Sequence, residues 1–134
     1  MSRENVEIVR RANALLNAGD IEPAFAVIDP RVEFRDLQNA PDLPQVLHGH
    51  DSLRLVLGHL IDAYEEFGVE VYEYIDADPW VIADVRWHGK GKDSEVPVEV
   101  RQVDMCRFEG GKITEWVVGY ADMATAMKAV GVER

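Results

Sequence analysis

The sequence predicts an α+β fold: a curved, mainly antiparallel sheet wrapped around N-terminal helices, forming a cone with an internal pocket. Two observations predict it. Apolar residues recur at helical spacing in the first half of the chain, and they alternate with period 2 over most of residues 69–120. Helices followed by a run of strands are typical of α+β folds. The 134 residues, 47% of them hydrophobic, predict a single domain spanning residues 1–134.

The first two helices are predicted from their ends. Ser2 is a suitable N-cap with Glu4 in the first turn, and Gly19 is placed to end this helix. Asp20 is expected to cap a second, shorter helix. The proline at position 30 ends it, because the residue before a proline disfavours the helical conformation.

Two further helices follow from amphipathic stripes. The stronger one is expected to start at Asp51 or Ser52 and to end at Gly68. Its apolar stripe comprises Leu53, Val56, Leu57, Leu60, Ile61, Tyr64 and Phe67. Asp122 is expected to cap a short last helix.

The strands are predicted from alternation and from turn residues between them. A short early strand covers residues 32–36, and a meander follows at residues 69–76, 80–89, 96–108 and 112–120. The segment through Pro41 and Pro44 is predicted to be a loop, and such loops often carry function.

One face of the third meander strand is largely apolar but contains an acid, Asp104. Burying an unpaired carboxylate is costly, so this acid needs a partner such as Gln102 or must be protonated. Alternation predicts that the inward-facing set lines an aromatic-walled pocket: Ala83, Val85, Trp87, Asp104, Cys106, Phe108, Trp116, Val118 and Tyr120.

Composition excludes several classes of function. The net charge of −11 argues against nucleic-acid binding. No apolar run is long enough to span a membrane, and the polar N-terminus is unlike a secretory signal. A lone cysteine, Cys106, fits a reducing cytoplasm. His48 and His50 have no further ligand at a suitable spacing, so neither a metal site nor a cofactor is predicted.

The chain also resembles a known family. The order of elements, the "LNAGD" of residues 16–20 and the "RFEGGKI" of residues 107–113 are similar to the nuclear-transport-factor-2-like superfamily, a cystatin-like cone fold that includes SnoaL-like polyketide cyclases and ketosteroid isomerases. The "ENVEIVRRA" of residues 4–12 and the later "GKI" and "YAD" resemble SnoaL-like proteins most. The fold hosts many activities, so the resemblance alone does not name one.

The resemblance implies roles for two acids. By analogy with ketosteroid isomerases, Asp36 after the early strand corresponds to the general base, and Asp104 in Asp104-Met105-Cys106-Arg107-Phe108 corresponds to the neutral acid that donates a hydrogen bond to the oxyanion. The tyrosine of that family is absent, because Ala12 stands at its position, flanked by Arg11 and Asn13. Tyr120 or Tyr64 is a candidate replacement.

These residues lead to one functional hypothesis and two alternatives. The first is a cofactor-free acid–base enzyme, an isomerase or aldol-type cyclase, that forms an enolate from a small hydrophobic carbonyl compound. The second is a protein of the same fold that binds a small molecule without chemistry. The third is an epoxide hydrolase or dehydratase, for which Glu99 and Arg101 would form the rival site if they faced inward.

The opposite face of the sheet is predicted to be outward. It mixes charged and apolar residues, which favours a homodimer: Glu99, Arg101, Val103, Met105, Ile113 and Val117. Glu99 and Arg101 are expected to form a surface or dimer salt bridge there. The aromatic residues Trp87, Trp116 and Tyr120 have an alternative interpretation as ordinary core packing.

Overall fold

The computed structural model describes residues 2–38 and 46–132. Its elements, in chain order, are α1 (Ser2–Asn17), the 3₁₀ helix η1 (Glu22–Val27), β1 (Ile28–Asp36), β2 (Val46–His48), α2 (Gly49–Ala63), β3 (Tyr64–Ala77), β4 (Trp80–Gly91), β5 (Pro97–Glu109), β6 (Lys112–Tyr120) and α3 (Met123–Ala129). The prediction of an α+β fold is confirmed. The predicted Pro41–Pro44 loop lies outside the described residues.

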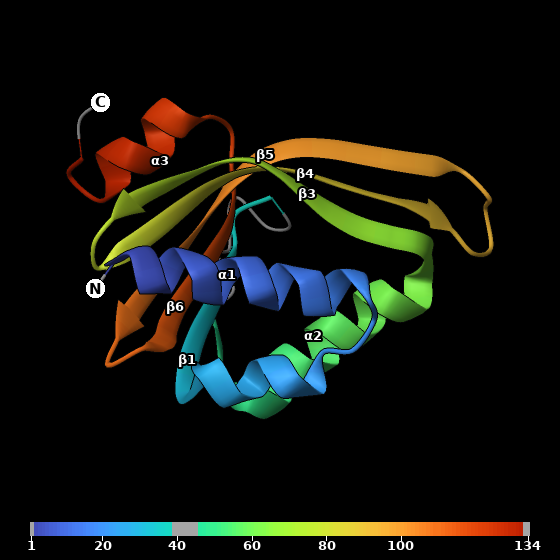
Figure 1. Cartoon of the computed structure of the whole chain (residues 1–134). Coiled ribbons are helices and arrows are strands. Elements are labelled where there is room, and N and C mark those ends of the chain that lie inside the picture. Colours follow the sequence, from blue (N-terminus) through green and yellow to red (C-terminus); the bar gives the residue numbers. More distant parts are fainter. Residues whose placement is uncertain (1, 39–45, 133–134) are drawn as a thin grey trace.

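The strands form one curved sheet in the order β2-β1-β6-β5-β4-β3 (Figure 1). Strands β3 to β6 form the antiparallel meander that alternation predicts. The early strand β1 joins this meander by pairing parallel to β6, and β2 pairs antiparallel to β1. Because β1 lies beside β6, the first and the last strand of the chain are neighbours inside the sheet.

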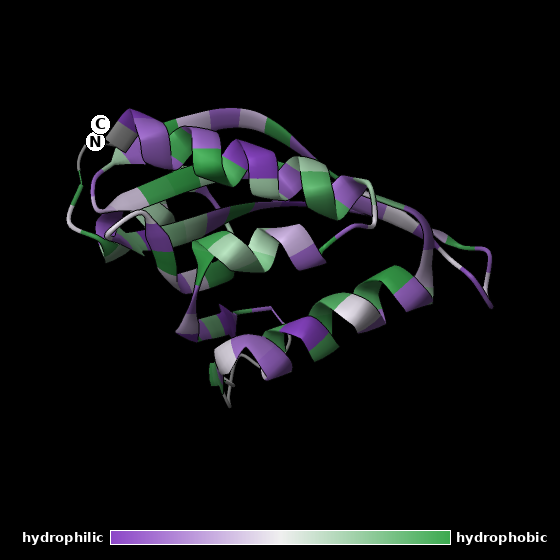
Figure 2. Ribbon diagram, turned by 60° about the horizontal axis from the view of Figure 1, so that its bottom comes forward, coloured by the Kyte–Doolittle hydropathy of each residue, from purple (hydrophilic) through white to green (hydrophobic). Residues whose placement is uncertain are grey.

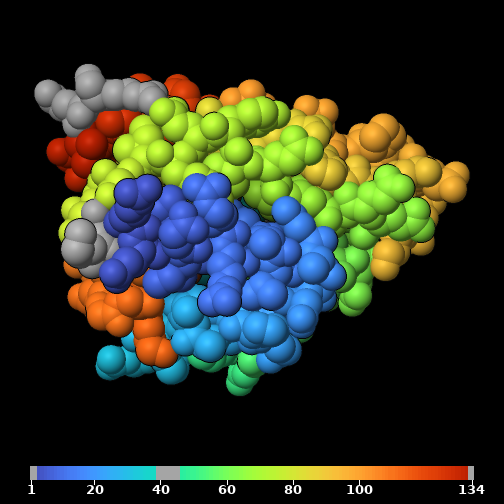
Figure 3. All heavy atoms as spheres, in the orientation of Figure 1, coloured from blue at the N-terminus to red at the C-terminus, as the bar shows by residue number. Residues whose placement is uncertain are grey.

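Helices α1 and α2 lie on the concave side of the sheet, and α3 lies on the opposite side (Figure 1). Figure 2 shows apolar and polar residues alternating around the helices, as amphipathic helices require. Figure 3 shows α1 in contact with β3. The position of α3 corrects the expectation that all helices cover one face. Its Ala126 and Met127 pack against Ile82, Val103 and Met105, an apolar patch on the convex face.

That patch also corrects part of the predicted outer surface. Val103 and Met105 are buried under α3 and are therefore not available to a partner. Ile113 is buried in the concave-side core, because β6 shifts register against β5 between the pairs at Arg107 and Phe108. The homodimer predicted through this face stays a prediction.

Helix α2 begins and ends earlier than its apolar stripe predicts. It ends at Ala63, and Tyr64 is already extended, with φ −126° and ψ 138°. Tyr64 and Phe67 therefore belong to β3, where aromatic residues are favoured. The positive φ of Glu66, 56°, marks the irregular start of this strand.

The other helix ends agree with the sequence except at η1. Gly19, with φ 73°, follows the end of α1, and Asp122 caps α3 by accepting a hydrogen bond from the Thr125 N–H at 2.8 Å. Asp20 does not cap η1: Ile21 occupies the N-cap position and makes no side-chain hydrogen bond. Pro23 in the first turn supplies the helical φ instead.

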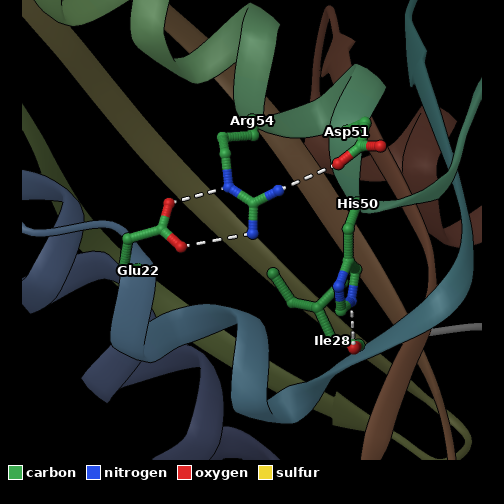
Figure 4. A network of polar contacts seen from close by, with 5 residues as sticks. All are labelled: Glu22, Ile28, His50, Asp51 and Arg54. Carbon is green, nitrogen blue, oxygen red and sulfur yellow. Dashed lines mark hydrogen bonds and ion pairs between the residues drawn. The ribbon is translucent and has the colours of Figure 1, made fainter.

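Polar contacts attach the start of α2 to η1 and β1 (Figure 4). Arg54 binds the Glu22 carboxylate through two nitrogens, at 2.7 and 3.2 Å, and reaches Asp51 at 3.1 Å. The His50 ring contacts the Ile28 carbonyl at 2.7 Å and packs edge-on against Phe25. His50 therefore has a structural role here.

Within the described residues, no helix is both long and apolar enough to cross a bilayer.

Candidate functional site

A cavity lies between the concave face of the sheet and the helices α1, η1 and α2. It offers about 70 Å³ to the centres of water-sized molecules, and ~10–15 Å³ of such space holds one water. Its walls comprise Val9, Ala12, Asn13, Leu16, Ile21, Ala24, Ile28, Leu57, Val69, Val81, Ala83, Val85, Asp104, Cys106, Ile113 and Trp116. The cavity is therefore apolar, with one carboxyl group in its wall, and accepts only compact molecules in this form.

The groups that donate hydrogen bonds to the Asp104 carboxyl are neutral. Its Oδ1 accepts hydrogen bonds from the Gln102 side-chain amide at 2.9 Å and from the Gly119 backbone N–H at 3.0 Å. Among the described residues, no donor forms a hydrogen bond with Oδ2. Since no fully buried side-chain oxygen in this part of the chain lacks a partner, Oδ2 is not fully buried. Because Asp104 lines the cavity, Oδ2 is the oxygen left to bond a molecule there. No arginine, lysine or histidine of the described chain pairs with this acid.

Burial dominates the electrostatics of Asp104. Removal from water raises its pKa from 3.8 to about 7. The hydrogen bonds from Gly119 and Gln102 lower the pKa, because they stabilise the charged form, and the charge of Asp36 raises it. Near neutral pH the carboxyl therefore populates both protonation states, which suits a general acid or base.

A bulge in β6 brings the Gly119 N–H to Asp104. The register of β5 against β6 shifts between Val103 and Met105, and Gly119 has φ 98°, a conformation that side chains strongly disfavour. A Cβ atom at this position would lie 2.7 Å from Gln38 Cγ. A glycine is thus required both for the backbone angle and for the approach of Gln38.

The same bulge reverses the direction of Tyr120, and the prediction that this tyrosine faces the cavity is wrong. Tyr120 packs with the convex-face cluster under α3 and lines a second, shallow cleft of about 200 Å³ beside Trp80 and Arg35. Burial raises the pKa of its hydroxyl, and the nearby Arg35 charge lowers it. Tyr120 therefore cannot assist Asp104 directly.

Of the other predicted pocket residues, Cys106 and Trp116 line the cavity. Burial raises the pKa of the Cys106 thiol, and the charge of Asp104 raises it further, so the thiol stays protonated. Phe108 and Val118 belong to the surrounding core and not to the wall. Phe34 meets Trp116 edge-on at 5.2 Å, which fixes the indole ring.

Trp87 and Tyr64 are not in the cavity wall. They form an aromatic cluster with Phe67, in which Trp87 lies 5.8 Å from Tyr64 and 6.1 Å from Phe67. For Trp87 the packing interpretation holds, and Tyr64 does not take the place of the missing tyrosine in the cavity. Tyr64 lies outside the cavity wall because α2 ends before it and the chain continues into β3.

Asp36 lies at the end of β1 and accepts a hydrogen bond from the Gln38 N–H at 3.0 Å, in a local turn. Its charge affects Asp104, but it is not among the residues that line the cavity. The structure thus does not show two acids facing each other across one pocket.

One polar residue of the cavity wall was not singled out from the sequence as a site residue. Asn13 of α1 lines the cavity next to Ala12, and its Nδ2 donates to the Tyr74 hydroxyl at 3.4 Å, a long bond. An amide has two N–H groups and an acceptor oxygen, so it can also bind a ligand. Asn13 lies four residues after Val9 and three before Leu16, so helical periodicity places the three on one face. This spacing is the sequence pattern that could have indicated Asn13 as a cavity residue.

Glu99 and Arg101 lie on the convex face, away from Asp104. Glu99 pairs with Arg86 at 3.1 Å, and Arg101 pairs with Asp84 at 3.0 Å. They form surface salt bridges, although not with each other. The rival site at Glu99 and Arg101 therefore does not share the cavity with Asp104.

In the part of the chain that the structure describes, no three His, Cys, Asp or Glu side chains are grouped so that they could hold a metal ion. 

Solved structures share this fold over nearly the whole chain. One is an NTF2-like protein of unknown function from Burkholderia pseudomallei, with 18% identity, a TM-score of 0.76, and 93% of this chain and 95% of that chain covered. A second, a candidate SnoaL-like polyketide cyclase from Jannaschia sp., has 17% identity and a TM-score of 0.77, covering 98% and 94%.

A third solved structure is a protein with a ketosteroid isomerase-like fold from Catenulispora acidiphila, in complex with trimethylamine. It has 16% identity and a TM-score of 0.73, with 95% of this chain and 94% of that chain covered. No curated protein matches the sequence. The family model of the SnoaL-like domain matches residues 9–116, and the chain belongs to this family.

Proposed function

We propose that the protein is a cofactor-free acid–base catalyst that enolises a compact carbonyl compound, as an isomerase or aldol-type cyclase. The observation that carries this proposal is Asp104, an acid with a pKa of about 7 whose free Oδ2 faces an apolar cavity. The SnoaL-like family includes cyclases and isomerases, which supports the reaction class.

In the proposed reaction, ionised Asp104 takes a proton from the carbon next to the carbonyl through Oδ2. The electrons of the broken C–H bond move into the enolate, and the Asn13 amide donates a hydrogen bond to the enolate oxygen. The neutral acid then returns the proton to another carbon, giving an isomer. Alternatively, the enolate carbon attacks a second carbonyl of the same molecule, and the alkoxide that forms takes the proton back from Asp104, giving a cyclic aldol. The apolar walls strengthen these electrostatic interactions by excluding water.

The size of the cavity limits the substrate. About 70 Å³ of space has room for a few waters or one compact molecule, and a steroid does not fit unless the helices move apart. A short-chain ketone is therefore the proposed substrate class for this form of the cavity. A six-membered cyclic ketone needs the cavity to widen, because a cavity of about 150 Å³ is what accommodates benzene.

The test is hydrogen exchange on a panel of compact ketones in D₂O, followed by NMR, together with the isomerisation of 3-cyclohexenone to its conjugated isomer. We expect exchange above the buffer rate, falling by ~10²–10⁴-fold in Asp104→Asn. The matched control is Asp84→Asn, an aspartate of the same sheet on the other face, which should keep the wild-type rate. Equal rates in wild type and Asp104→Asn would overturn the proposal.

A second candidate function is the binding of a small aliphatic amine without chemistry. It is favoured because the acid in the cavity wall has no cationic partner among the described residues, and a relative of this fold is seen with trimethylamine. An ammonium group would supply that missing charge. Trimethylamine binding measured by calorimetry should then be stronger at pH 8 than at pH 5.5, where Asp104 is neutral; no binding at either pH would exclude this candidate.

A further inference from the structure

The segment that follows β1 is bonded to the β6 bulge through several consecutive groups. The Leu37 N–H donates to the Val118 carbonyl at 2.9 Å, and the Gln38 side-chain amide donates to the Gly119 carbonyl at 2.7 Å. The Gln38 N–H in turn binds the Asp36 carboxylate at 3.0 Å, which fixes the turn itself. Residues 36–38 therefore hold both peptide groups that flank the Gly119 Cα.

One of these peptide groups connects the turn directly to the acid of the cavity. The amide between Val118 and Gly119 accepts from Leu37 through its carbonyl and donates to Asp104 Oδ1 through its N–H, at 3.0 Å. Hydrogen bonds in such a series polarise one another, and each strengthens the next. The orientation of the second peptide group, at the Gly119 carbonyl, depends on the Gln38 side chain.

Gly119 cannot hold this geometry alone. Glycine has more conformational freedom than any other residue type, and Gly119 adopts a φ of 98°. The orientation of its two peptide groups must therefore be fixed by neighbouring residues. Gln38 lies close enough over it that an added Cβ would be 2.7 Å from Gln38 Cγ and 3.2 Å from the Gln38 nitrogen.

We propose that Gln38 is a positioning residue of this site: by bonding the Gly119 carbonyl and packing over the Gly119 Cα, it fixes the backbone angles of this glycine and, together with the Leu37 N–H on the preceding carbonyl, keeps the Gly119 N–H directed at the Asp104 carboxylate. This inference rests on Asp104 being the acid–base group of the proposed function. It assigns a role to the turn at residues 36–38, which lies outside the cavity wall. Through this turn, the segment after β1 maintains one of the two hydrogen bonds that the acid accepts.

The charges around Asp104 make the effect measurable. Its titratable neighbours are the Asp36 carboxylate of β1 and the Cys106 thiol of β5. The residues that α1, η1, α2, β3, β4 and β6 contribute to the cavity wall are uncharged. A change in the Gly119 hydrogen bond is therefore not masked by another ion pair.

The experiment is an NMR titration of the carboxyl carbons in wild type, Gln38→Leu and Gln38→Asn, without any ligand. Losing the hold on Gly119 weakens a hydrogen bond that favours the charged form, so Gln38→Leu should raise the pKa of Asp104 by roughly 0.5–1 pH unit. Gln38→Asn keeps an amide but shortens its reach, and it should give a smaller rise. The matched control is Asp122→Ala, which removes the cap of α3 on the other face and should leave this pKa unchanged.

An unchanged pKa in Gln38→Leu, or an equal rise in Asp122→Ala, would overturn the inference. Both outcomes are independent of activity. The wild-type exchange assay with ketones tests the proposed function separately, so either idea can fail while the other stands.

Discussion

Two aspartates one residue apart along the ladder of β4 and β5 show how much the side of a sheet decides. Asp84 pairs with Val103 and faces the convex side, and Asp104 pairs with Ala83 and faces the cavity. Both oxygens of Asp84 accept from Arg101 at 3.0 Å, whereas Asp104 has only neutral donors. The same side chain thus forms an ion pair on the convex face in one place and lines a cavity without a cationic partner in the other.

Partner charge and burial, not residue type, therefore determine what a carboxyl group can do. An acid that is paired with arginine at the surface stays ionised and adds little to stability. An acid that is buried without a cation changes its protonation state near neutral pH. Substitutions at the two aspartates and around them should therefore have different effects.

The pH dependence of ketone exchange gives the largest effect. If Asp104 is the base, kcat/KM should rise about tenfold per pH unit below pH 7 and level off above it, since only the ionised form accepts a proton. Asp84→Asn should show the same profile. Activity that instead falls above pH 7 would make Asp104 a neutral hydrogen-bond donor and not the base.

The stabilities of Asp104→Asn and Asp84→Asn should change in opposite directions. With its pKa raised from 3.8 to about 7, Asp104 binds a proton in the native state that the unfolded chain has released, so the free energy of unfolding falls as pH rises from about 4 to about 7. The full difference is about 4 kcal/mol. Asp104→Asn should therefore be more stable than wild type by ~2–4 kcal/mol at pH 8 and similar to it at pH 4.

Urea unfolding at the two pH values measures these changes. Asp84→Asn should lose at most ~1 kcal/mol at pH 8, because it breaks only a partly exposed ion pair. A loss of stability in Asp104→Asn at pH 8 would show that the carboxylate is stabilised in a way that the structure does not account for.

Substitution of Gly119 in the bulge should destabilise the protein more than substitution of a glycine that also has a positive φ but lies in open space. Gly119→Ala combines an unfavourable φ with a contact to Gln38 and should lower the free energy of unfolding by roughly 2–3 kcal/mol. Gly131→Ala has a similar φ, 72°, but no atom within 4 Å, and should lower it by roughly 1 kcal/mol. Thermal unfolding compares the two, and equal losses would mean that Gln38 does not pack tightly on Gly119.

The smallest effect belongs to the ion pairs of the convex face. Arg101→Gln removes the partner of Asp84 and should lower the free energy of unfolding by less than ~1 kcal/mol. The loss should shrink in 1 M salt, which screens exposed charges. A large, salt-independent loss would indicate that Arg101 acts through its packing over the Tyr72 ring, 4.1 Å away.

Local patterns predicted most of the fold. Alternation located β3 to β6 and the cap at Asp122 located α3, because these signals depend on neighbouring residues alone. The boundary between α2 and β3 was misplaced, since Tyr64 and Phe67 fit both a helical stripe and a strand. Which face α3 covers could not be predicted, because an apolar stripe does not indicate which of two apolar surfaces it will meet.

Alternation along β5 was enough to predict that Asp104 shares a face with Cys106, since it is a local property of one strand. The groups that surround this acid depend instead on how the chain packs in three dimensions. The bulge at Gly119 turned Tyr120 away, and the packing of α1 brought Asn13 to the cavity. The hold of Gln38 on Gly119 joins residues 81 positions apart. Such contacts depend on how distant segments pack, and no local pattern encodes them.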